Sequence, residues 1–506
     1  MRKLVQGVSL SVLLLAATGS FAAITVPVDA GPDWRGPDGS TALQWAVYEG
    51  DAERARTLIR AGADVSLANN YGANAMQLAA EMADLDMLKV LLDAGADADS
   101  ANPEGQTALM LVARTGNVDA ARLLVRAGAN VNARETWGQQ TALMWAAARR
   151  QSAMVEYLVE SGADINAQSI HRDYPRHVTK EGRAKNLDAG GLTPLMYAIR
   201  ENCLSCVEVL IENEVDLDLP DPDGTSPLLL AIHNSRWDIS KRLIEAGADI
   251  QQWDTFGQAP LLAIVSRHSG NRAEPGETLN ETSGTQVMQM LLERGANVNM
   301  QVFLRPAKQR GGTMSRGTTP LIQAASSGDV EAIKLLLEHG ADVNLPQADL
   351  QTAVSAVAGA RGNPDRLVES LNLLVAAGAD VNVRAVPHHL QRNRGGTPLI
   401  NAVRTNNAKV IEALVAAGAN IDAKDVDGLT ALDHAMSRNQ VGFLQMRQPA
   451  NDRIAELLRG LGAAAELDAV PFWPNVGPPF YYPWSIFPLD PAAEAAALVP
   501  GSFDHQ

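Results

Sequence analysis

The stretch that decides the fold is "GQTALMLVARTGNVDAARLLVRAGANVNARE", residues Gly105–Glu135. Thr107 is placed to cap a short helix, because its hydroxyl can accept a hydrogen bond from an N–H group of the first turn. Gly116 and Asn117 then turn the chain, and a second helix is expected over Val118–Arg126. The stretch therefore predicts two short helices joined by a tight turn.

The second of these helices carries the apolar side chains that need a neighbour. We expect Ala121, Leu123, Leu124 and Val125 to face the core. Gly128 ends the helix, since glycine adopts positive φ readily. The sequence "ANVNARE" then extends into a turn that leads to the next unit.

The unit recurs along the chain with a period that can be read from the third residue of each "TPL" or "TAL" triplet. Six of the ten successive gaps are 33 residues, one is 34, and the gaps of 52, 60 and 45 residues are 33 plus an insertion. A fixed period of this length indicates a repeat architecture, here of eleven units. The positions are Leu43, Met76, Leu109, Leu143, Leu195, Leu228, Leu261, Leu321, Val354, Leu399 and Leu432.

One helix pair cannot bury its apolar face alone, whereas stacked copies can, which gives a solenoid with contacts mostly between neighbours. The pattern "G-x-T-P-L-x-x-A-A…LL…GAD-VN" resembles the ankyrin repeat family over about residues 38–464. The resemblance implies an all-α repeat solenoid of stacked helix–turn–helix units with short β-hairpin fingers.

The resemblance also implies how the protein acts. Ankyrin repeat proteins bind other macromolecules through their fingers and concave helix face, and they are not catalytic as such. One departure from the pattern is Glu214, which stands where glycine is expected. The positions that would face a ligand are Tyr48, Glu49, Arg114, Thr115, Arg149, His233, Asn234, Arg267 and Arg404.

The N-terminal residues 1–22 have the three parts of a secretory signal: Arg2 and Lys3, the apolar run Val8–Ala17, and the small-x-small site Ser20-Phe21-Ala22. A membrane anchor is the alternative, but the apolar run is short for a span. We expect an exported protein, periplasmic or secreted, without stable membrane insertion after signal removal. A linker over 23–37, the repeat array over 38–465 and a tail over 466–506 follow.

Composition limits the partners. The chain has 58 acidic and 42 basic residues and a formal charge of −16, which argues against nucleic acid and anionic membranes, because phosphate binding draws on a basic surface. No Ser/His/Asp arrangement, phosphate loop or metal-spaced cluster stands out, so we predict neither an enzyme nor a cofactor.

Insertions interrupt the regular units near residues 168–190, 267–284, 300–316, 384–395 and 440–450, and the ninth unit has five further residues between its helices. Three of the insertions fall at fingers and are basic. Their basic residues include Arg172, Arg176, Arg183, Arg305, Lys308, Arg310, Arg316, Arg384, Arg392 and Arg394.

Long loops on a regular scaffold are often functional. We therefore interpret the basic insertions as one broken cationic edge that binds a protein with an acidic contact surface. An anionic envelope polymer is an alternative partner, and surface loops that are basic by chance are the simpler explanation.

Cys203 and Cys206 are the only cysteines. In an oxidising compartment a local disulfide is the favoured interpretation. Two free thiols and a redox-active C-x-x-C are the alternatives. A zinc site would need two further ligands, and none is suitably spaced.

Aromatic residues supply further binding candidates. Tyr71, Trp137 and Phe256 precede finger glycines and are expected to be exposed. Trp45, Trp145 and Tyr197 lie in the first helices of their units, either as binding anchors on the concave face or as packing between repeats. The tail "VPFWPNVGPPFYYPWSIFPLDP" is rich in proline and aromatic residues, and it either covers the last repeat or docks on a partner.

Overall fold

The computed structural model of the chain describes residues 27, 29–171, 190–255, 257–268, 280–302, 317–385, 396–426, 428–436, 440–441, 446–447 and 451–464. The expected signal peptide and the tail over 466–506 lie outside these residues. Within them, 22 helices form consecutive pairs, and the pairs fall into two compact units, one ending at Asp249 and one beginning at Ile250.

The first unit contains six helix pairs. Their bounds are α2 Ala42–Glu49, α3 Ala52–Arg60, α4 Ala75–Met82, α5 Leu85–Asp93, α6 Ala108–Thr115, α7 Val118–Arg126, α8 Ala142–Ala148, α9 Ser152–Glu160, α10 Pro194–Arg200, α11 Leu204–Glu212, α12 Pro227–His233 and α13 Trp237–Ala246.

The second unit contains five pairs. Their bounds are α14 Pro260–His268, α15 Gly284–Glu293, α16 Pro320–Ser327, α17 Val330–Glu338, α18 Ala353–Gly359, α19 Pro364–Ala376, α20 Pro398–Arg404, α21 Ala408–Ala416, α22 Ala431–Met436 and α23 Asp452–Gly460. Two short antiparallel strands, β1 Gln440–Val441 and β2 Met446–Arg447, pair between α22 and α23, with Gln440 opposite Arg447.

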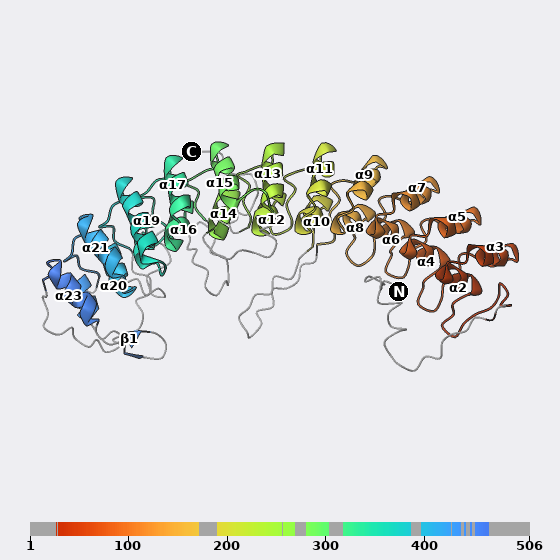
Figure 1. The fold of residues 1–506 in the computed structure, drawn as a ribbon, viewed down its shortest axis with the longest axis horizontal. Helices are drawn as coiled ribbons and strands as arrows, with labels where there is room; N and C mark the ends of the chain where they lie inside the picture. The colour runs from red at the N-terminus through yellow and green to blue at the C-terminus, as the bar shows by residue number, and fades with distance from the viewer. Residues whose placement is uncertain are drawn as a thin grey trace, which may run out of the picture. The chain divides into compact units, whose positions relative to one another are not determined.

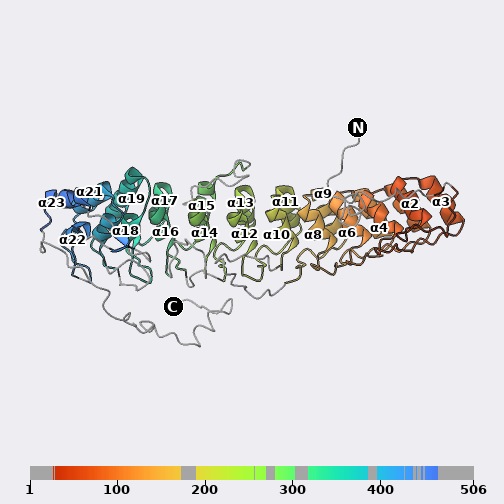
Figure 2. The same ribbon diagram turned by 90° about the horizontal axis from the view of Figure 1, so that it is seen from below.

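Each unit is a two-layered stack. The first helices of successive pairs pack on one another in one layer, and the second helices pack in the other (Figure 1). The same two layers are visible within each unit from below (Figure 2). This arrangement is the predicted all-α repeat solenoid, in which the helices make their main contacts within a pair and with the neighbouring pair.

Local sequence sets where the helices begin. Thr107 Oγ1 accepts a hydrogen bond from the Met110 N–H at 3.4 Å, so it caps α6 as expected. Pro194 occupies the first position of α10, where no N–H group is needed for the helix. Asp51 caps the second helix α3 in the same way, by accepting from the Arg54 N–H at 2.9 Å.

The triplet positions form the core. All eleven residues that revealed the period, from Leu43 to Leu432, are at most 1% exposed. In α7, Ala121 and Leu124 are buried, but the prediction for Leu123 and Val125 was wrong, because both are only half-buried. Ala120 is buried instead, so that α7 faces its neighbours α5, α6 and α9 with Ala120, Ala121 and Leu124.

A finger is the loop that joins the second helix of one pair to the first helix of the next. The expected β-hairpins are reduced in the described residues to isolated bridges such as Ala101–Thr107. Side-chain acceptors close the loops instead. In the first unit, Asp221 Oδ1 accepts from the N–H groups of Asp223 and Thr225 at 2.9 and 2.8 Å, which is the local bonding that favours Asp and Asn in turns.

A side-chain ladder ties successive fingers together. Asn132 Nδ2 donates to the carbonyl oxygen of Gly162 at 2.9 Å, and its Oδ1 accepts from the Asp164 N–H at 2.7 Å. Asn299, Asn344 and Asn382 make the same two bonds to the following finger in the second unit. We call this series the asparagine ladder.

Among the described helices, none combines the length and apolar character needed to cross a bilayer. The extra residues of the ninth unit lengthen its second helix, because α19 has 13 residues where α17 and α21 have nine.

Candidate functional site

The best-defined exposed surface lies in the first unit. It combines the fingers before α4 and α8 with the C-terminal ends of the first helices α2, α4, α6, α8 and α10, and we call it the finger face.

Tyr71 lies at the tip of the finger between α3 and α4 and is 55% exposed. The loop under it is closed by Asn69, whose Oδ1 accepts from the N–H groups of Tyr71 and Ala73, both at 3.0 Å. The Asn69 N–H also donates to the Ala73 carbonyl at 2.9 Å. The ring is therefore presented by a backbone that is already ordered.

Trp137 lies at the tip of the finger between α7 and α8 and is 71% exposed. This finger is one residue longer than the finger between α5 and α6, and Gln139 takes up the extra residue with φ 54°. Glu135, 3% exposed, stands where shorter fingers have Asn or Asp. Its carboxylate accepts from the N–H groups of Trp137, Gly138 and Gln140 at 2.5, 2.6 and 3.1 Å.

Three first helices contribute a stacked polar row. Arg114 on α6 pairs with Glu81 on α4 at 3.4 Å, and the two side chains are only 19% and 18% exposed. The Arg114 guanidinium also lies over the Trp145 ring on α8, 5.9 Å from its centroid. The Arg114 side chain is therefore held between the Glu81 carboxylate and the Trp145 ring, and the three residues belong to three successive repeats.

Tyr197 belongs to the packing between repeats, since it is 5% exposed. Gln140 Nε2 donates to its hydroxyl at 2.6 Å, and the Arg200 guanidinium covers its ring at 5.0 Å. Trp45 and Trp145 are half-buried, and their indole N–H groups are buried. These rings therefore support the finger face, and smaller parts of Trp45 and Trp145 reach its surface.

Exposed side chains complete the face. Tyr48 and Met82 are 54% and 51% exposed at the ends of α2 and α4, and Arg149 is exposed just after α8. Within the described residues Arg149 has no ion pair. Charge changes along the face, with Glu49 on the first repeat and arginines on the third to fifth.

Only one of the basic candidates in the finger insertions belongs to the described residues. Arg384, in the finger that follows α19, is described and exposed. The other basic candidates and Phe256 lie outside the described residues, namely Arg172, Arg176, Arg183, Arg305, Lys308, Arg310, Arg316, Arg392 and Arg394. The predicted cationic edge is therefore an untested hypothesis.

Cys203 and Cys206 are joined by a disulfide at the start of α11, and they are 2% and 0% exposed. Cys203 also caps the helix, because its Sγ accepts from the Cys206 N–H at 3.2 Å. A buried disulfide of this kind has no access for a redox partner.

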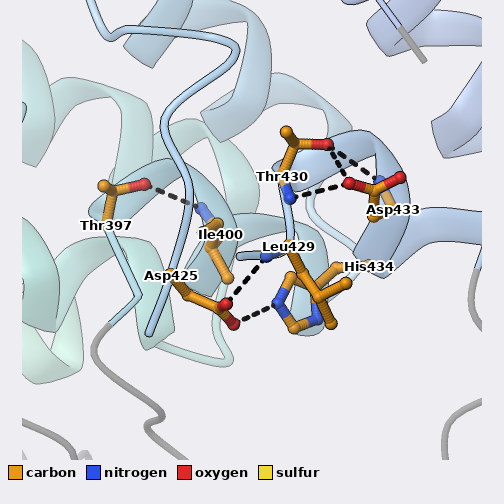
Figure 3. Close-up of polar contacts among 7 residues, drawn as sticks. All are labelled: Thr397, Ile400, Asp425, Leu429, Thr430, Asp433 and His434. Atoms are coloured by element: carbon orange, nitrogen blue, oxygen red, sulfur yellow. Dashed lines mark hydrogen bonds and ion pairs between the residues drawn. The ribbon is translucent and has the colours of Figure 1, made fainter. Parts of the chain in front are cut away.

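The last finger of the second unit holds a buried polar pair that the sequence did not suggest (Figure 3). His434 Nε2 lies 2.7 Å from Asp425 Oδ2, and both side chains are at most 2% exposed. Asp425 Oδ1 also accepts from the Leu429 N–H at 3.0 Å, which closes the finger. Among the described residues no cluster of three His, Cys, Asp or Glu could hold a metal ion.

Thr430 and Asp433 bracket the start of α22 in the same view (Figure 3). The Thr430 N–H and hydroxyl donate to Asp433 Oδ2 at 2.9 and 2.8 Å, and Thr430 Oγ1 accepts from the Asp433 N–H at 3.2 Å. His434 occupies the repeat position held by Trp45, Trp145 and Tyr197. In the last repeat, a histidine that is hydrogen-bonded to Asp425 therefore stands where these three repeats have an aromatic ring.

Comparison with known proteins agrees with this construction. A family model described as "Ankyrin repeats (3 copies)" matches residues 13–102, 84–169, 176–254, 279–385 and 350–446, together more than half of the chain. The chain belongs to the ankyrin repeat family. Proteins of this family are generally non-catalytic scaffolds for protein–protein interaction.

This chain spans only a fifth or less of the length of the two relatives given first. One is an ankyrin repeat, SAM and basic leucine zipper domain-containing protein 1 from Dasypus novemcinctus, 35% identical over 103 residues, or 20% of each chain. Another is the potassium channel AKT2/3 from Arabidopsis thaliana, 29% identical over 135 residues, 26% of this chain and 15% of the channel. The solved ankyrin repeat domain of Bcl-3, a member of the IkappaB protein family, is 25% identical, covers 51% of this chain and 100% of its own, and has a TM-score of 0.40.

Proposed function

We propose that this chain is a non-catalytic scaffold that binds another protein through the finger face of its first unit, in the periplasm or outside the cell. The observation that carries the proposal is Trp137, 71% exposed on a finger whose backbone is bonded to the buried Glu135. A rigid, exposed tryptophan is the residue type most enriched at the energetic centres of protein interfaces.

The face also indicates the partner's chemistry. Tyr48, Tyr71 and Met82 offer apolar area near the first two repeats, whereas Arg149 offers an exposed cation near Trp137 in sequence. Arginine binds carboxylates with two parallel hydrogen bonds. The expected partner surface carries an apolar side chain for the fingers and a carboxylate for the arginine.

The test is quantitative capture of partner protein from an extract of the native host. Trp137→Ala should weaken binding by about 30-fold, the effect of losing a central tryptophan. Arg149→Glu should weaken it further by placing a like charge against the acidic contact. Titration of the identified partner against each purified variant, by calorimetry, gives the affinities.

Two matched variants serve as controls. Trp253→Ala removes another exposed tryptophan, from the second unit, and Arg126→Glu reverses an exposed charge on the second helix α7 of the same unit as Trp137. Both should leave the affinity within twofold. If Trp137→Ala and Trp253→Ala weaken the affinity for the partner equally, the finger face is not the binding site.

The basic insertions support a second candidate, binding of an anionic envelope polymer. Its support is the sequence: the insertions over 300–316 and 384–395 contain no Asp or Glu. Charge reversal of Arg305, Lys308 and Arg310 should then abolish salt-sensitive binding to such polymers without changing capture of the protein partner. Loss of the protein partner instead would assign these loops to the protein interface.

A redox role for Cys203 and Cys206 is disfavoured by their burial. Partner binding should survive replacement of both cysteines by serine. Location is tested separately, because export with cleavage after Ala22 predicts a mature chain beginning at Ala23, which intact mass spectrometry of the periplasmic fraction measures.

A further inference from the structure

The second unit contains a cavity of about 440 Å³ at the ends of its helix pairs that lie away from the fingers. Three neighbouring segments form it: the turn between α18 and α19, the turn between α20 and α21 with the start of α21, and the start of α23. The lining residues are Ala360, Arg361, Gly362, Pro364, Thr405, Asn406, Asn407, Ala408, Lys409, Asn451, Arg453 and Ile454.

The hollow has a cause in the sequence. The ninth unit has a longer connection between its helices, residues 360–363, and its second helix α19 has 13 residues where α17 and α21 have nine. The tenth unit keeps a short turn over residues 405–407. A short turn beside a lengthened one leaves a recess, which α23 closes on its other side.

The cavity is cationic in an acidic protein. The lining includes three basic side chains, Arg361 before α19, Lys409 in the first turn of α21 and Arg453 in the first turn of α23. None of the twelve lining residues is Asp or Glu. Lys409 Nζ donates to Asp365 Oδ1. Arg361 and Arg453 are exposed and have no ion pair within the described residues, so two guanidinium groups are available to an anion.

The helix ends reinforce this charge. Asn407 and Asn451 cap α21 and α23, where their Oδ1 atoms accept from the N–H groups of Val410 and Ile454 at 3.4 and 3.2 Å. The N-terminal ends of both helices therefore point at the cavity, and each carries a partial positive charge.

We propose that this cavity binds a small polyanion through its phosphate or carboxylate oxygens, with Arg361 and Arg453 as the principal contacts. The volume lies in the range of small-molecule sites and exceeds that needed for a single ion. Guanidinium groups from two separate segments of the chain suit a ligand with more than one anionic group. The site is independent of the finger face, which belongs to the first unit.

The test is calorimetric titration of the full chain with inorganic pyrophosphate and with citrate at low ionic strength. Arg361→Ala and Arg453→Ala should each weaken binding about tenfold or more, the ratio expected for loss of a charge-assisted hydrogen bond. Both residues are exposed, so thermal unfolding should be unchanged.

The matched control is Arg366→Ala, which removes an exposed arginine of α19 that does not line the cavity. Its affinity should stay within twofold of the natural chain. Absence of binding to both probes, or equal weakening by Arg366→Ala, would overturn the site.

A further variant separates two sources of the anion. Residues 465–506 contain five acids, Glu466, Asp468, Asp490, Glu494 and Asp504, and no Lys or Arg. If replacing these five by amides raises the affinity for pyrophosphate, carboxylates of this segment are the natural occupant. If the affinity is unchanged, the occupant is a separate molecule.

Discussion

Asp218 occupies a position of the asparagine ladder where a carboxylate replaces the amide. Its Oδ1 accepts from the Asp249 N–H at 2.7 Å, but a carboxylate cannot donate to the Gly247 carbonyl as the ladder asparagines donate to the equivalent glycines. Burial raises the pKa of Asp218. The hydrogen bond from the Asp249 N–H lowers this pKa, whereas the nearby Asp249 and Asp216 carboxylates raise it further.

We predict that Asp218→Asn stabilises the protein at pH 7 by about 1 kcal/mol, the net value of one added hydrogen bond. A carboxyl group with a raised pKa in the folded state makes the free energy of unfolding fall as pH rises from the unfolded value of about 3.9 to the folded value. The variant removes that fall. Urea unfolding at pH 3.5 and pH 7 should show a larger gain at pH 7.

The reverse substitution Asn132→Asp is the control. It removes the donor to Gly162 while keeping an acceptor for the Asp164 N–H, so it should cost about 1 kcal/mol. If Asp218→Asn raises the free energy of unfolding equally at both pH values, titration of Asp218 does not contribute to the effect.

Glu214 has φ 58° at a repeat position where other units have glycine. The left-handed region costs a residue with a Cβ atom about 1–2 kcal/mol, part of which glycine returns through its freedom in the unfolded chain. We predict that Glu214→Gly raises the free energy of unfolding by about 1 kcal/mol, measured by urea titration. The equivalent Gly247 has φ 98° and open space where a Cβ atom would lie, so its change to Ala should lose a similar amount through the backbone alone.

At the scale of the element, the finger over residues 134–140 depends on Glu135. Removal of its carboxylate leaves the N–H groups of Trp137, Gly138 and Gln140 without this acceptor. We predict that Glu135→Ala lowers stability by about 2 kcal/mol and speeds amide exchange at these three positions. Glu104→Ala, on the exposed tip of the preceding finger, should leave the exchange of these amides unchanged.

Most of the helical framework could be predicted from the sequence because it follows local rules. The caps at Thr107 and Thr193, the turn at Gly116 and the bounds of α7 each depend on residues only a few positions apart. The repeat period added the stacking of the helix pairs, because one pair alone cannot bury its apolar face.

The candidate site was only partly predictable. Exposure of Tyr71 and Trp137 followed from their places before finger glycines. The row of Glu81, Arg114 and Trp145 was not predicted as a unit, because it joins residues on three repeats. A signal was present, since Glu81 and Arg114 stand 33 residues apart, at the same place in successive repeats. Likewise, the gap of 34 residues beside Glu135 marked the longer finger.

At the scale of the whole molecule, stability is approximately the sum of the stabilities of the repeats and of the contacts between neighbouring repeats. Asp425 stabilises the last finger by accepting hydrogen bonds from His434 Nε2 and from the Leu429 N–H. Asp425→Ala leaves buried polar groups without this partner and should cost the last repeat about 2–3 kcal/mol. Hydrogen exchange should rise in α22 and α23, while the amides of α2–α13 keep their protection.

Asp422→Ala changes a less buried acid of the same region, whose Oδ1 accepts from the Ala464 N–H. It should have a smaller effect, confined to the chain after α23. Loss of protection in α2–α13 on either change would contradict a stack that loosens from its end.

The longer finger at Trp137 shows how this architecture accommodates length. One added methylene in an acidic side chain, Glu135 in place of Asp, reaches across one added backbone residue, and the helices on either side keep their caps and burial. The extra residue is thus accommodated within the finger itself. Graftable segments inserted between Thr136 and Gln139 should be displayed outward, which makes this tip a natural attachment point for epitopes or reporter peptides.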